Sequence, residues 1–238
     1  MKRRSFLRWK DFKRRAVTLS YDDGPKFDER LIEIMESNGL KGTFNLNSNY
    51  LGQGGLTTWL KKVVSHSKVE ASEVKDLYKG PEVAVHTLTH PHLEEIEDEA
   101  EIVRQVEEDR KKLSELCGYE VVGMAYPYGT YNDKVVKCIL EKTGVKYSRT
   151  VKSTYDFTPQ KEDLLRFHPT VYYVEKCLEE VVDKFLATET DEPQLLYIWG
   201  HTYELDAELI TWEAFERVCQ KLANRDDIFY GTNKEVLL

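Results

Sequence analysis

The sequence lacks the marks of several large classes of protein. No uninterrupted apolar run in its 238 residues approaches the roughly 20 residues that a membrane-spanning helix needs. Its four cysteines lie far apart without a C-x-x-C pair, which fits neither a zinc knuckle nor a dense disulfide framework and favours reduced thiols in the core. Basic residues number 34 against 42 acidic ones, and the formal net charge of −8 argues against binding along nucleic-acid phosphates.

The N-terminal segment is the one strongly basic part of the chain. Residues 1–15 contain eight Lys or Arg and one Asp, and the run 3–8 (RRSFLR) looks like the start of a twin-arginine export signal. Such a signal needs an apolar stretch of about 7–15 residues directly behind it, whereas the charged run 9–15 (WKDFKRR) follows here. We therefore expect a cytoplasmic protein whose residues 1–15 are a solvated basic lead-in, rather than a patch for an anionic partner.

Strand-like and helix-like segments alternate along the rest of the chain. Strand-like segments occupy 16–21, 43–47, 82–86, 121–126, 146–149, 164–167, 195–199 and 228–230, and helix-like stretches occupy 31–37, 93–117, 132–143, 174–185 and 212–222. Such alternation predicts a parallel sheet with crossover helices. No G-x-G-x-x-G or P-loop follows the first strand, so a nucleotide-binding open sheet is not favoured. The expected fold is α/β, a distorted (β/α) barrel of seven or eight parallel strands in one domain, 1–238.

Polar residues follow most of the predicted strands. In chain order they are Asp22 and Asp23, Asn47, His86, the run 126–128 (YPY), Arg149, His168 and His201. The carboxyl ends of barrel strands share one face, and active sites lie there. Residues far apart in the sequence are therefore expected to meet in one pocket.

Two carboxylates and several imidazoles on one face suggest a metal site. Zinc prefers His nitrogen and carboxylate oxygen, with an open position in catalytic sites. His86 and His90 are four residues apart, although position 87 is Thr, so the helical H-E-x-x-H arrangement does not apply. Asp22 and Asp23 reach one pocket only if the chain turns after them, which Gly24 and Pro25 allow; a plain polar turn is the alternative. His66 and His92 are not expected to take part.

Four short motifs carry a resemblance to a known family. They are 21–25 (YDDGP), 86–90 (HTLTH), 126–129 (YPYG) and 199–201 (WGH), in this order and each at a strand end. Between about Val17 and His201, they make the chain similar to the polysaccharide deacetylases, the carbohydrate esterase family 4 or NodB-homology group. The resemblance implies a barrel, often of seven strands, that hydrolyses an N-acetyl group with one divalent metal, zinc first and cobalt, manganese or nickel as alternatives.

The resemblance also implies roles for individual residues. Asp23, His86 and His90 match the metal ligands, while Asp22 matches the catalytic base and His201 the catalytic acid. Tyr128 matches the residue whose backbone N–H helps to hold the oxyanion, and Trp199 stands where the family usually has the leucine of the acetyl pocket. The expected substrate-binding residues are Tyr128, Trp199, Arg149 and Asn47. Aromatic residues expected near the rim are Tyr126, Tyr128, Tyr131, Tyr155, Trp199 and Tyr203.

Two positions depart from the family pattern. Ala125 stands where motif three usually has an arginine that pairs with the catalytic Asp, so the pKa of Asp22 is expected to rise unless Arg149 or Arg166 supplies the charge. Motif four, an Asp that supports the catalytic His, is not recognisable; Asp156 and Asp163 are candidates.

Three functions follow as hypotheses. The first is a metal-dependent deacetylase acting on an N-acetylated sugar, oligosaccharide or small amide. The second, prompted by Ala125 and the missing motif four, is a non-catalytic or weakly active carbohydrate-binding barrel. The third is a phosphatase with Asp22 as nucleophile, which the adjacent spacing of Asp22 and Asp23 disfavours, because the common pattern places two aspartates two residues apart.

Overall fold

A computed structural model describes residues 9–59 and 61–238, so the first eight residues of the predicted basic lead-in lie outside the described residues. The strands are β1 (Arg15–Asp22), β2 (Gly42–Leu46), β3 (Leu56–Trp59), β4 (Lys62–Ser65), β5 (Glu82–Val85), β6 (Gly123–Ala125), β7 (Tyr147–Arg149), β8 (Val171–Tyr172), β9 (Gln194–His201) and β10 (Ile228–Tyr230). The helices are α1 (Asp28–Ser37), α2 (Val74–Leu77), α3 (Glu99–Cys117), α4 (Asp133–Lys142), α5 (Leu178–Ala187), α6 (Tyr203–Asp206), α7 (Trp212–Leu222) and α8 (Asn233–Leu237). No helix among these residues is both long and apolar enough to cross a membrane.

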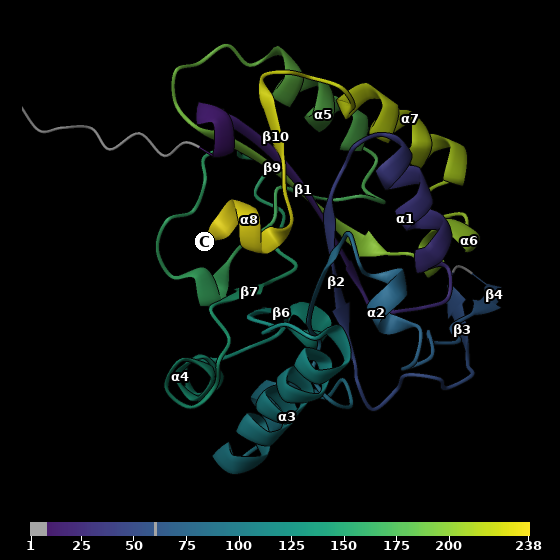
Figure 1. Cartoon of the computed structure of the whole chain (residues 1–238), viewed down its shortest axis with the longest axis vertical. Helices are drawn as coiled ribbons and strands as arrows, with labels where there is room; N and C mark the ends of the chain where they lie inside the picture. Colours follow the sequence, from purple (N-terminus) through teal and green to yellow (C-terminus); the bar gives the residue numbers. More distant parts are fainter. Residues whose placement is uncertain (1–8, 60) are drawn as a thin grey trace, which may run out of the picture.

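The main sheet runs in the order β7-β6-β5-β2-β1-β9-β8, and every neighbouring pair in it is parallel. β10 also pairs in parallel with β1, at residues 15–17, whereas β2 pairs with residues 19–22 of the same strand. Figure 1 shows α1, α5 and α7 along one side of the strands and α3 and α4 along the other. The prediction of a distorted (β/α) barrel is confirmed.

The barrel closes between β7 and β9 through little backbone pairing, which the segment 167–172 supplies. Phe167 forms a parallel bridge with Arg149, and the backbone N–H of Thr150 donates to the carbonyl of Phe167 at 2.8 Å. A few residues later, Val171 and Tyr172 of β8 pair with β9. The predicted strand 164–167 is therefore wrong except at its last residue.

Alternate side chains of β1 face opposite sides of the sheet, as strand geometry requires. Val17 and Leu19 point outward into the main apolar cluster under the helices. Ala16 points inward, where it packs with Tyr197 and Trp199 of β9. The other inward positions of β1 carry Thr18, Ser20 and Asp22, so the barrel interior is partly polar.

A hydrogen-bonded column connects α8 with the end of β1 through this interior. The amide of Asn233 donates to the hydroxyl of Ser20 at 3.1 Å, and the amide of Asn45 donates to the same hydroxyl at 3.0 Å. The Asn45 amide also donates to Asp22 Oδ1 at 2.8 Å. The last polar group of the column is thus a carboxylate at the carboxyl end of the barrel, where a site was expected.

Two predicted boundaries differ from the structure. The long helix was expected from position 93, but α3 begins at Glu99 because the Asp98 side chain caps it by accepting from the backbone N–H of Ala100 at 2.9 Å. Leu93–Glu95 forms a separate 3-10 turn. At 164–167, Leu164–Arg166 is a 3-10 turn that follows Asp163, whose φ of +53° breaks the extended backbone.

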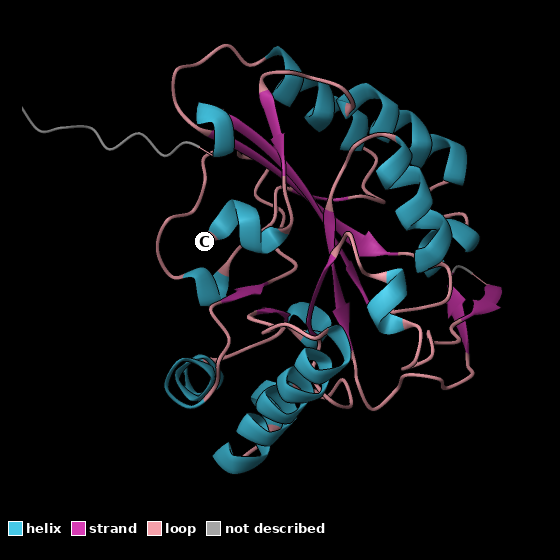
Figure 2. Ribbon diagram, in the orientation of Figure 1, coloured by secondary structure: helices cyan, strands magenta, loops and turns pink. Residues whose placement is uncertain are grey.

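The antiparallel hairpin of β3 and β4 was not predicted. Leu56 is 74% exposed and Val63 is 60% exposed, so the apolar alternation of a half-buried strand is absent there. Val64 faces the other way and packs with Tyr203. Figure 2 shows the two short strands projecting at the edge of the molecule. After them the chain returns to the barrel, where Lys68 forms an antiparallel bridge with Pro25.

Candidate active site

The end of β1 places two carboxylates in different surroundings. Asp22 is the last residue of β1, while Asp23 has φ of +78° and Gly24 has φ of +60°, so the chain turns sharply here. A Cβ at Gly24 would lie 2.7 Å from the Leu46 side chain, which makes glycine necessary at this turn. The turn predicted from Gly24 and Pro25 therefore brings both aspartates to the barrel mouth.

Asp23 faces the two histidines of the 86–90 loop. Its Oδ1 lies 3.8 Å from His86 Nε2 and 3.8 Å from His90 Nε2. The ligand atoms of these three residues all lie within 4.8 Å of one another. One carboxylate oxygen and two imidazole nitrogens form the donor set of an open catalytic zinc site, so the residues present fit a divalent metal.

The surroundings of the two imidazoles leave their Nε2 atoms available. His86 Nδ1 lies 2.9 Å from the carbonyl oxygen of Ala125, so this nitrogen carries the hydrogen and Nε2 keeps its lone pair. Burial, together with the neighbouring His86, lowers the pKa of His90 to about 4, so this ring is neutral near pH 7. Neutral imidazoles are the forms that bind metals.

The 86–90 loop is held in shape by Asn47. Its amide donates to the backbone carbonyls of His86 and Thr87, the latter at 2.9 Å, and Thr87 itself has φ of +67°. Asn47 is only 2% exposed and lies outside the lining of the cavities described below. The Asn47 amide is thus engaged in positioning the histidine loop, and the predicted contact of Asn47 with substrate stays a prediction.

His66 was not expected at the site, yet it lies against Asp23. Its Nε2 is 3.3 Å from Asp23 Oδ2, the oxygen that does not face the other two histidines, and 3.0 Å from the ammonium of Lys68. Burial opposes ionisation of Asp23, but the hydrogen bond from His66 and the charge of Lys68 outweigh it and hold the pKa of Asp23 well below its usual range. His66 was missed because the sequence pattern did not predict the β3–β4 hairpin. The chain that follows β4 brings His66 to the barrel mouth.

Asp22 is paired with Arg149 of β7. The Arg149 guanidinium donates to Asp22 Oδ2, and both side chains are almost completely buried. Burial raises the pKa of Asp22, but the Arg149 charge outweighs it, so the pKa lies below its usual value. Arg149 thus supplies the cation that Ala125 lacks. It is fully buried beneath the Trp199 ring, and its predicted contact with substrate stays a prediction.

His201 lies beside Asp22 and is flanked by a second buried carboxyl group. His201 Nε2 is 3.8 Å from Asp22 Oδ2, while Nδ1 is 3.2 Å from Glu204 Oε1. Glu204 also accepts hydrogen bonds from the His201 backbone N–H at 2.9 Å and from the Tyr172 hydroxyl. Burial raises the pKa of Glu204 to about 9 and lowers the pKa of His201. Near pH 7 this carboxyl group is protonated and the ring is neutral.

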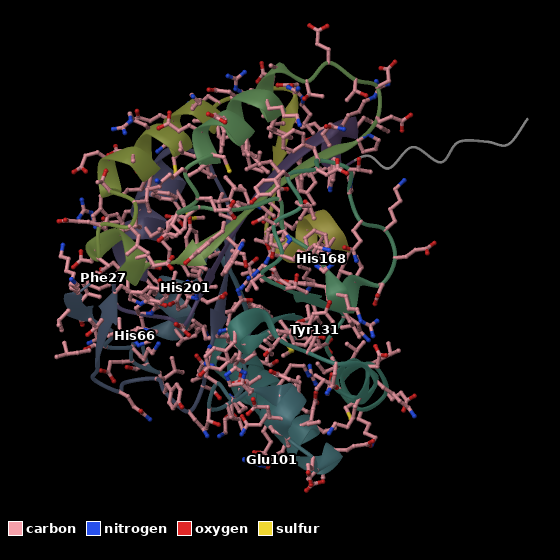
Figure 3. The ribbon with its side chains drawn as sticks, turned by 180° about the vertical axis from the view of Figure 1, so that it is seen from behind. Phe27, His66, Glu101, Tyr131, His168 and His201 are labelled. Carbon is pink, nitrogen blue, oxygen red and sulfur yellow. The ribbon has the colours of Figure 1, made fainter. Side chains whose placement is uncertain are left out.

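Four other candidates do not reach this site. Arg166 pairs with Asp163 and Asp133, so neither Arg166 nor Asp163 takes up the predicted role. Asp156 is exposed and accepts from its neighbour Thr158. His168 Nδ1 lies 2.7 Å from the Thr150 hydroxyl, and Figure 3 shows His168 well apart from His66 and His201.

Two cavities meet at these residues. The first, about 510 Å³, is mainly aromatic and is lined by Trp59, Tyr126, Val151, Tyr172 and Trp199 beside Asp22, His86 and His201. The second, about 580 Å³, is lined by Tyr50, Gln53, Gly54, Gly55, Thr57, His66, Lys68 and Thr89. Asp23, His90, Tyr128 and Tyr203 line both. We call them the aromatic cavity and the polar cavity; the candidate metal ligands lie where they join.

Of the aromatic residues expected at the rim, four line the aromatic cavity: Tyr126, Tyr128, Trp199 and Tyr203. Trp199 stacks on Tyr172 with ring centroids 4.2 Å apart, so the wall at this position is flat and broad. Tyr131 stacks behind Tyr126, and the Tyr155 hydroxyl donates to Glu175, so neither of these two lines it.

Comparisons with known proteins identify the family and support the fold. The family described as polysaccharide deacetylase matches residues 10–148, and no curated protein matches the chain. The family 4 carbohydrate esterase from Streptomyces lividans, solved in complex with acetate, has a TM-score of 0.56 at 19% identity over 92% of this chain and 93% of its own. The Streptococcus pyogenes deacetylase PplD, also with acetate, has a TM-score of 0.53 at 18% identity over 63% of this chain.

A family 4 pseudoenzyme from Bacillus anthracis has the same fold, with a TM-score of 0.51 at 18% identity over 94% of this chain. The chain spans 61% of the length of the S. pyogenes protein and 65% of the B. anthracis protein. At such identities the likeness is one of fold, and the fold is shared by active and inactive relatives.

Proposed function

The chain belongs to the polysaccharide deacetylase family, and from its site we propose that it is a metal-dependent hydrolase that removes an acetyl or similar acyl group from the nitrogen of a sugar or related amide. The proposal depends on one observation: the two adjacent aspartates at the end of β1 face different partners. Asp23 Oδ1 faces His86 and His90 at 3.8 Å, whereas Asp22 is held by Arg149 and faces His201 instead.

Asp23, His86 and His90 would hold the metal. When bound, a divalent cation polarises the carbonyl oxygen of an amide and lowers the pKa of water. His66 keeps one oxygen of Asp23 occupied, which leaves the other directed at the two imidazoles. The donor set agrees with zinc, and also with cobalt, manganese or nickel.

Asp22 is the proposed base. Its lowered pKa means that the carboxylate is ionised near pH 7, and hydrogen bonds from Arg149 and Asn45 fix its orientation. It takes a proton from the attacking water while the oxygen of that water forms the new bond to the acyl carbon. Tyr128, whose φ of +57° turns the backbone at the cavity, is proposed to offer its N–H to the oxygen that becomes negative.

His201 is the proposed acid, and Glu204 is proposed to support it. Glu204 Oε1 lies 3.2 Å from Nδ1, and a proton on this oxygen, once directed at Nδ1, would fix the tautomer with hydrogen on Nε2. When Nε2 gives its proton to the departing amine, Nδ1 accepts the proton of Glu204, so no bare imidazolate forms. The carbon–nitrogen bond breaks, and an acid and an amine leave. Asp22 then releases its proton to solvent, Nε2 of His201 takes a proton from solvent, and Nδ1 returns its proton to Glu204.

The test is hydrolysis of N-acetylated chito-oligosaccharides and small acetamides with added zinc, cobalt or manganese, followed by release of free amine. We expect turnover that needs the metal and that Asp22→Asn abolishes. Well-folded, metal-loaded protein without turnover on any acyl amide or ester would contradict the proposal.

The alternative is a barrel that binds carbohydrate without efficient chemistry. Of the two departures that prompted it, the charge missing at Ala125 is supplied by Arg149, whereas neither candidate for motif four, Asp156 or Asp163, contacts His201. Tight sugar binding that Asp22→Asn leaves unaltered, with no amine released, would support this alternative over the hydrolase.

A further inference from the structure

Lys68 is a buried cation that the proposed chemistry does not use. It is 6% exposed and lines the polar cavity next to the candidate metal ligands. Its backbone is fixed on both sides, by a bridge to Pro25 and by donation of its N–H to the carbonyl of Gln53 at 2.9 Å. The side chain is therefore held in place at the cavity and does not lie along the outer surface.

The ammonium of Lys68 has no anionic partner at ion-pair distance. Among residues 9–59 and 61–238, no carboxylate oxygen lies within 4 Å of it, and its polar contact is His66 Nε2 at 3.0 Å. Of the carboxylates nearby, Asp23 is directed at its three histidines, and Asp28 accepts from Thr202 and, at 2.7 Å, from Tyr78. Asp23 and Asp28 therefore act on the buried ammonium of Lys68 only from beyond ion-pair distance, and a ligand with a negative charge would stabilise it by direct contact.

The balance of charge at the barrel mouth also favours an anionic ligand. Asp22 is neutralised by Arg149, and Asp23 is one negative charge against the two positive charges of the proposed metal. Lys68 then adds a further positive charge, so this end of the barrel attracts anions. Such a field is typical of sites for negatively charged substrates.

The polar cavity has room for a group of this kind. Its volume is about 580 Å³, and Tyr50, Gln53 and Thr57 make its wall polar. The Tyr50 hydroxyl and the Gln53 amide donate to backbone carbonyls, so Lys68 is the group proposed to bind the anion. A Cβ added at Gly54 would have no atom within 4 Å, so the backbone there borders open space. Because the cavity joins the aromatic cavity at Asp23 and His90, one ligand can occupy both.

We propose that the polar cavity binds an anionic oxygen group of the substrate, a carboxylate or a phosphate, at Lys68 while the acyl group occupies the aromatic cavity. This inference rests on the proposed hydrolase function and narrows its substrate class to acidic N-acyl sugars or related acidic amides. Lys68 is then a specificity-determining residue, and His66, which contacts both Lys68 and Asp23, holds the anion site next to the metal site.

The experiment measures binding of deacylated amines, because the proposed reaction does not consume them. Glucosamine, glucosamine 6-phosphate and muramic acid are titrated into the zinc-loaded protein by calorimetry, so that the phosphate and the carboxylate are tested separately. We expect at least one acidic ligand to bind roughly 10-fold tighter than glucosamine, the size of one charge-assisted hydrogen bond. Equal dissociation constants for all three would overturn the proposal.

Variants locate the effect. Lys68→Met should reduce the preference for the acidic ligand to within about twofold, whereas Lys68→Arg should retain most of it. Lys26→Met is the matched control, because Lys26 is an exposed lysine that pairs with Glu70 outside the polar cavity; it should leave the preference unchanged. A preference that survives Lys68→Met would overturn the proposal. If Lys68→Met does not fold, the comparison of ligands on the unaltered protein still decides.

The two proposals fail in different ways. If no substrate releases amine while the acidic ligand still binds tighter, the hydrolase proposal fails and the anion site stands. If neutral and acidic N-acetyl sugars are hydrolysed with equal kcat/KM and bind equally, the anion site fails and the hydrolase stands.

Discussion

Arg149 and Asp22 are 127 residues apart in the sequence, and their side chains meet in the interior of the barrel as a buried, hydrogen-bonded ion pair. The arginine comes from β7, one strand beyond β6, where Ala125 stands at the usual place of this charge. The cation has therefore moved to the neighbouring strand while still reaching the same carboxylate. Trp199 covers the guanidinium, with 4.4 Å between the guanidinium carbon and the ring centroid.

Loss of the Arg149 charge should change both stability and the pH profile. Arg149→Met leaves Asp22 buried without a counter-charge, which costs about 3–5 kcal/mol in the free energy of unfolding. Burial then acts unopposed and raises the pKa of Asp22, so the acidic limb of the kcat/KM profile should move to higher pH. Denaturant unfolding and the pH profile measure the two effects. Arg166→Met, which breaks surface pairs with Asp133 and Asp163, is the control, and an equal effect there would contradict this role of Arg149.

His66 should influence metal affinity through Asp23. His66→Ala removes the group that occupies Asp23 Oδ2, so we expect zinc to bind about 10- to 100-fold more weakly. Titration against a competing chelator measures this without any substrate. His168→Ala is the matched control, because His168 contacts Thr150 and not the ligands. Unchanged zinc affinity in His66→Ala would exclude a positioning role.

Glu204 should matter for proton transfer more than for binding. Glu204→Gln keeps the size of the side chain and an oxygen for the Tyr172 hydroxyl, but has no acidic proton for His201 Nδ1. We expect kcat to fall by roughly 10²-fold with little change in KM, as for loss of an acid–base group. Steady-state kinetics on the best acyl amide measure the split between the two. Glu208→Gln on the surface, where Glu208 pairs with Lys62, should leave both unchanged.

Trp199 should limit the size of the acyl group. Trp199→Leu removes the ring that stacks on Tyr172, so the aromatic cavity widens at that wall. We expect kcat/KM for a propionyl amide to rise relative to the acetyl amide by about 10-fold, the usual scale for one methylene in an apolar pocket. The ratio of the two kcat/KM values is the measurement, and a ratio that does not change would show that Trp199 does not border the acyl group.

Buried acids should make the protein less stable as the pH rises. Asp109 of α3 accepts from the backbone N–H groups of Ser48 at 2.7 Å and His86 at 3.3 Å, and burial raises its pKa to about 7. Its contribution is fully present below its unfolded pKa, near 4, and is lost as the pH rises through about 7. Thermal unfolding from pH 5 to pH 8 should show a smaller loss of stability in Asp109→Asn than in the unaltered protein. An equal loss in both proteins would contradict this.

Strand ends were the most informative part of the sequence. Asp22, Asp23, His86 and His201 each follow an apolar segment, and because the strands are parallel, position along the chain predicts which end of the barrel a residue occupies. The fold class and the family were predicted and are confirmed. The roles of the individual residues stay predictions, to be tested by the variants above.

Two site residues, His66 and Glu204, were not predicted, because they lie in segments that have no regular pattern of apolar residues. His66 arrives on a hairpin whose exposed Leu56 and Val63 hide the strand pattern. Glu204 sits in a one-turn helix just after His201, where an acidic residue in a polar stretch is indistinguishable from a surface carboxylate. Its complete burial, which gives it a raised pKa, depends on tertiary packing alone.

The column from Asn233 through Ser20 and Asn45 to Asp22 gives the far end of the molecule a share in the chemistry. Asn233 and Ser20 line neither the aromatic nor the polar cavity, yet through Asn45 they support the carboxylate of Asp22, which is proposed to accept a proton. We therefore expect substitutions in α8 to leave the Asp22 carboxylate less firmly fixed. Redesign of this protein should treat α8 as part of the proposed active site.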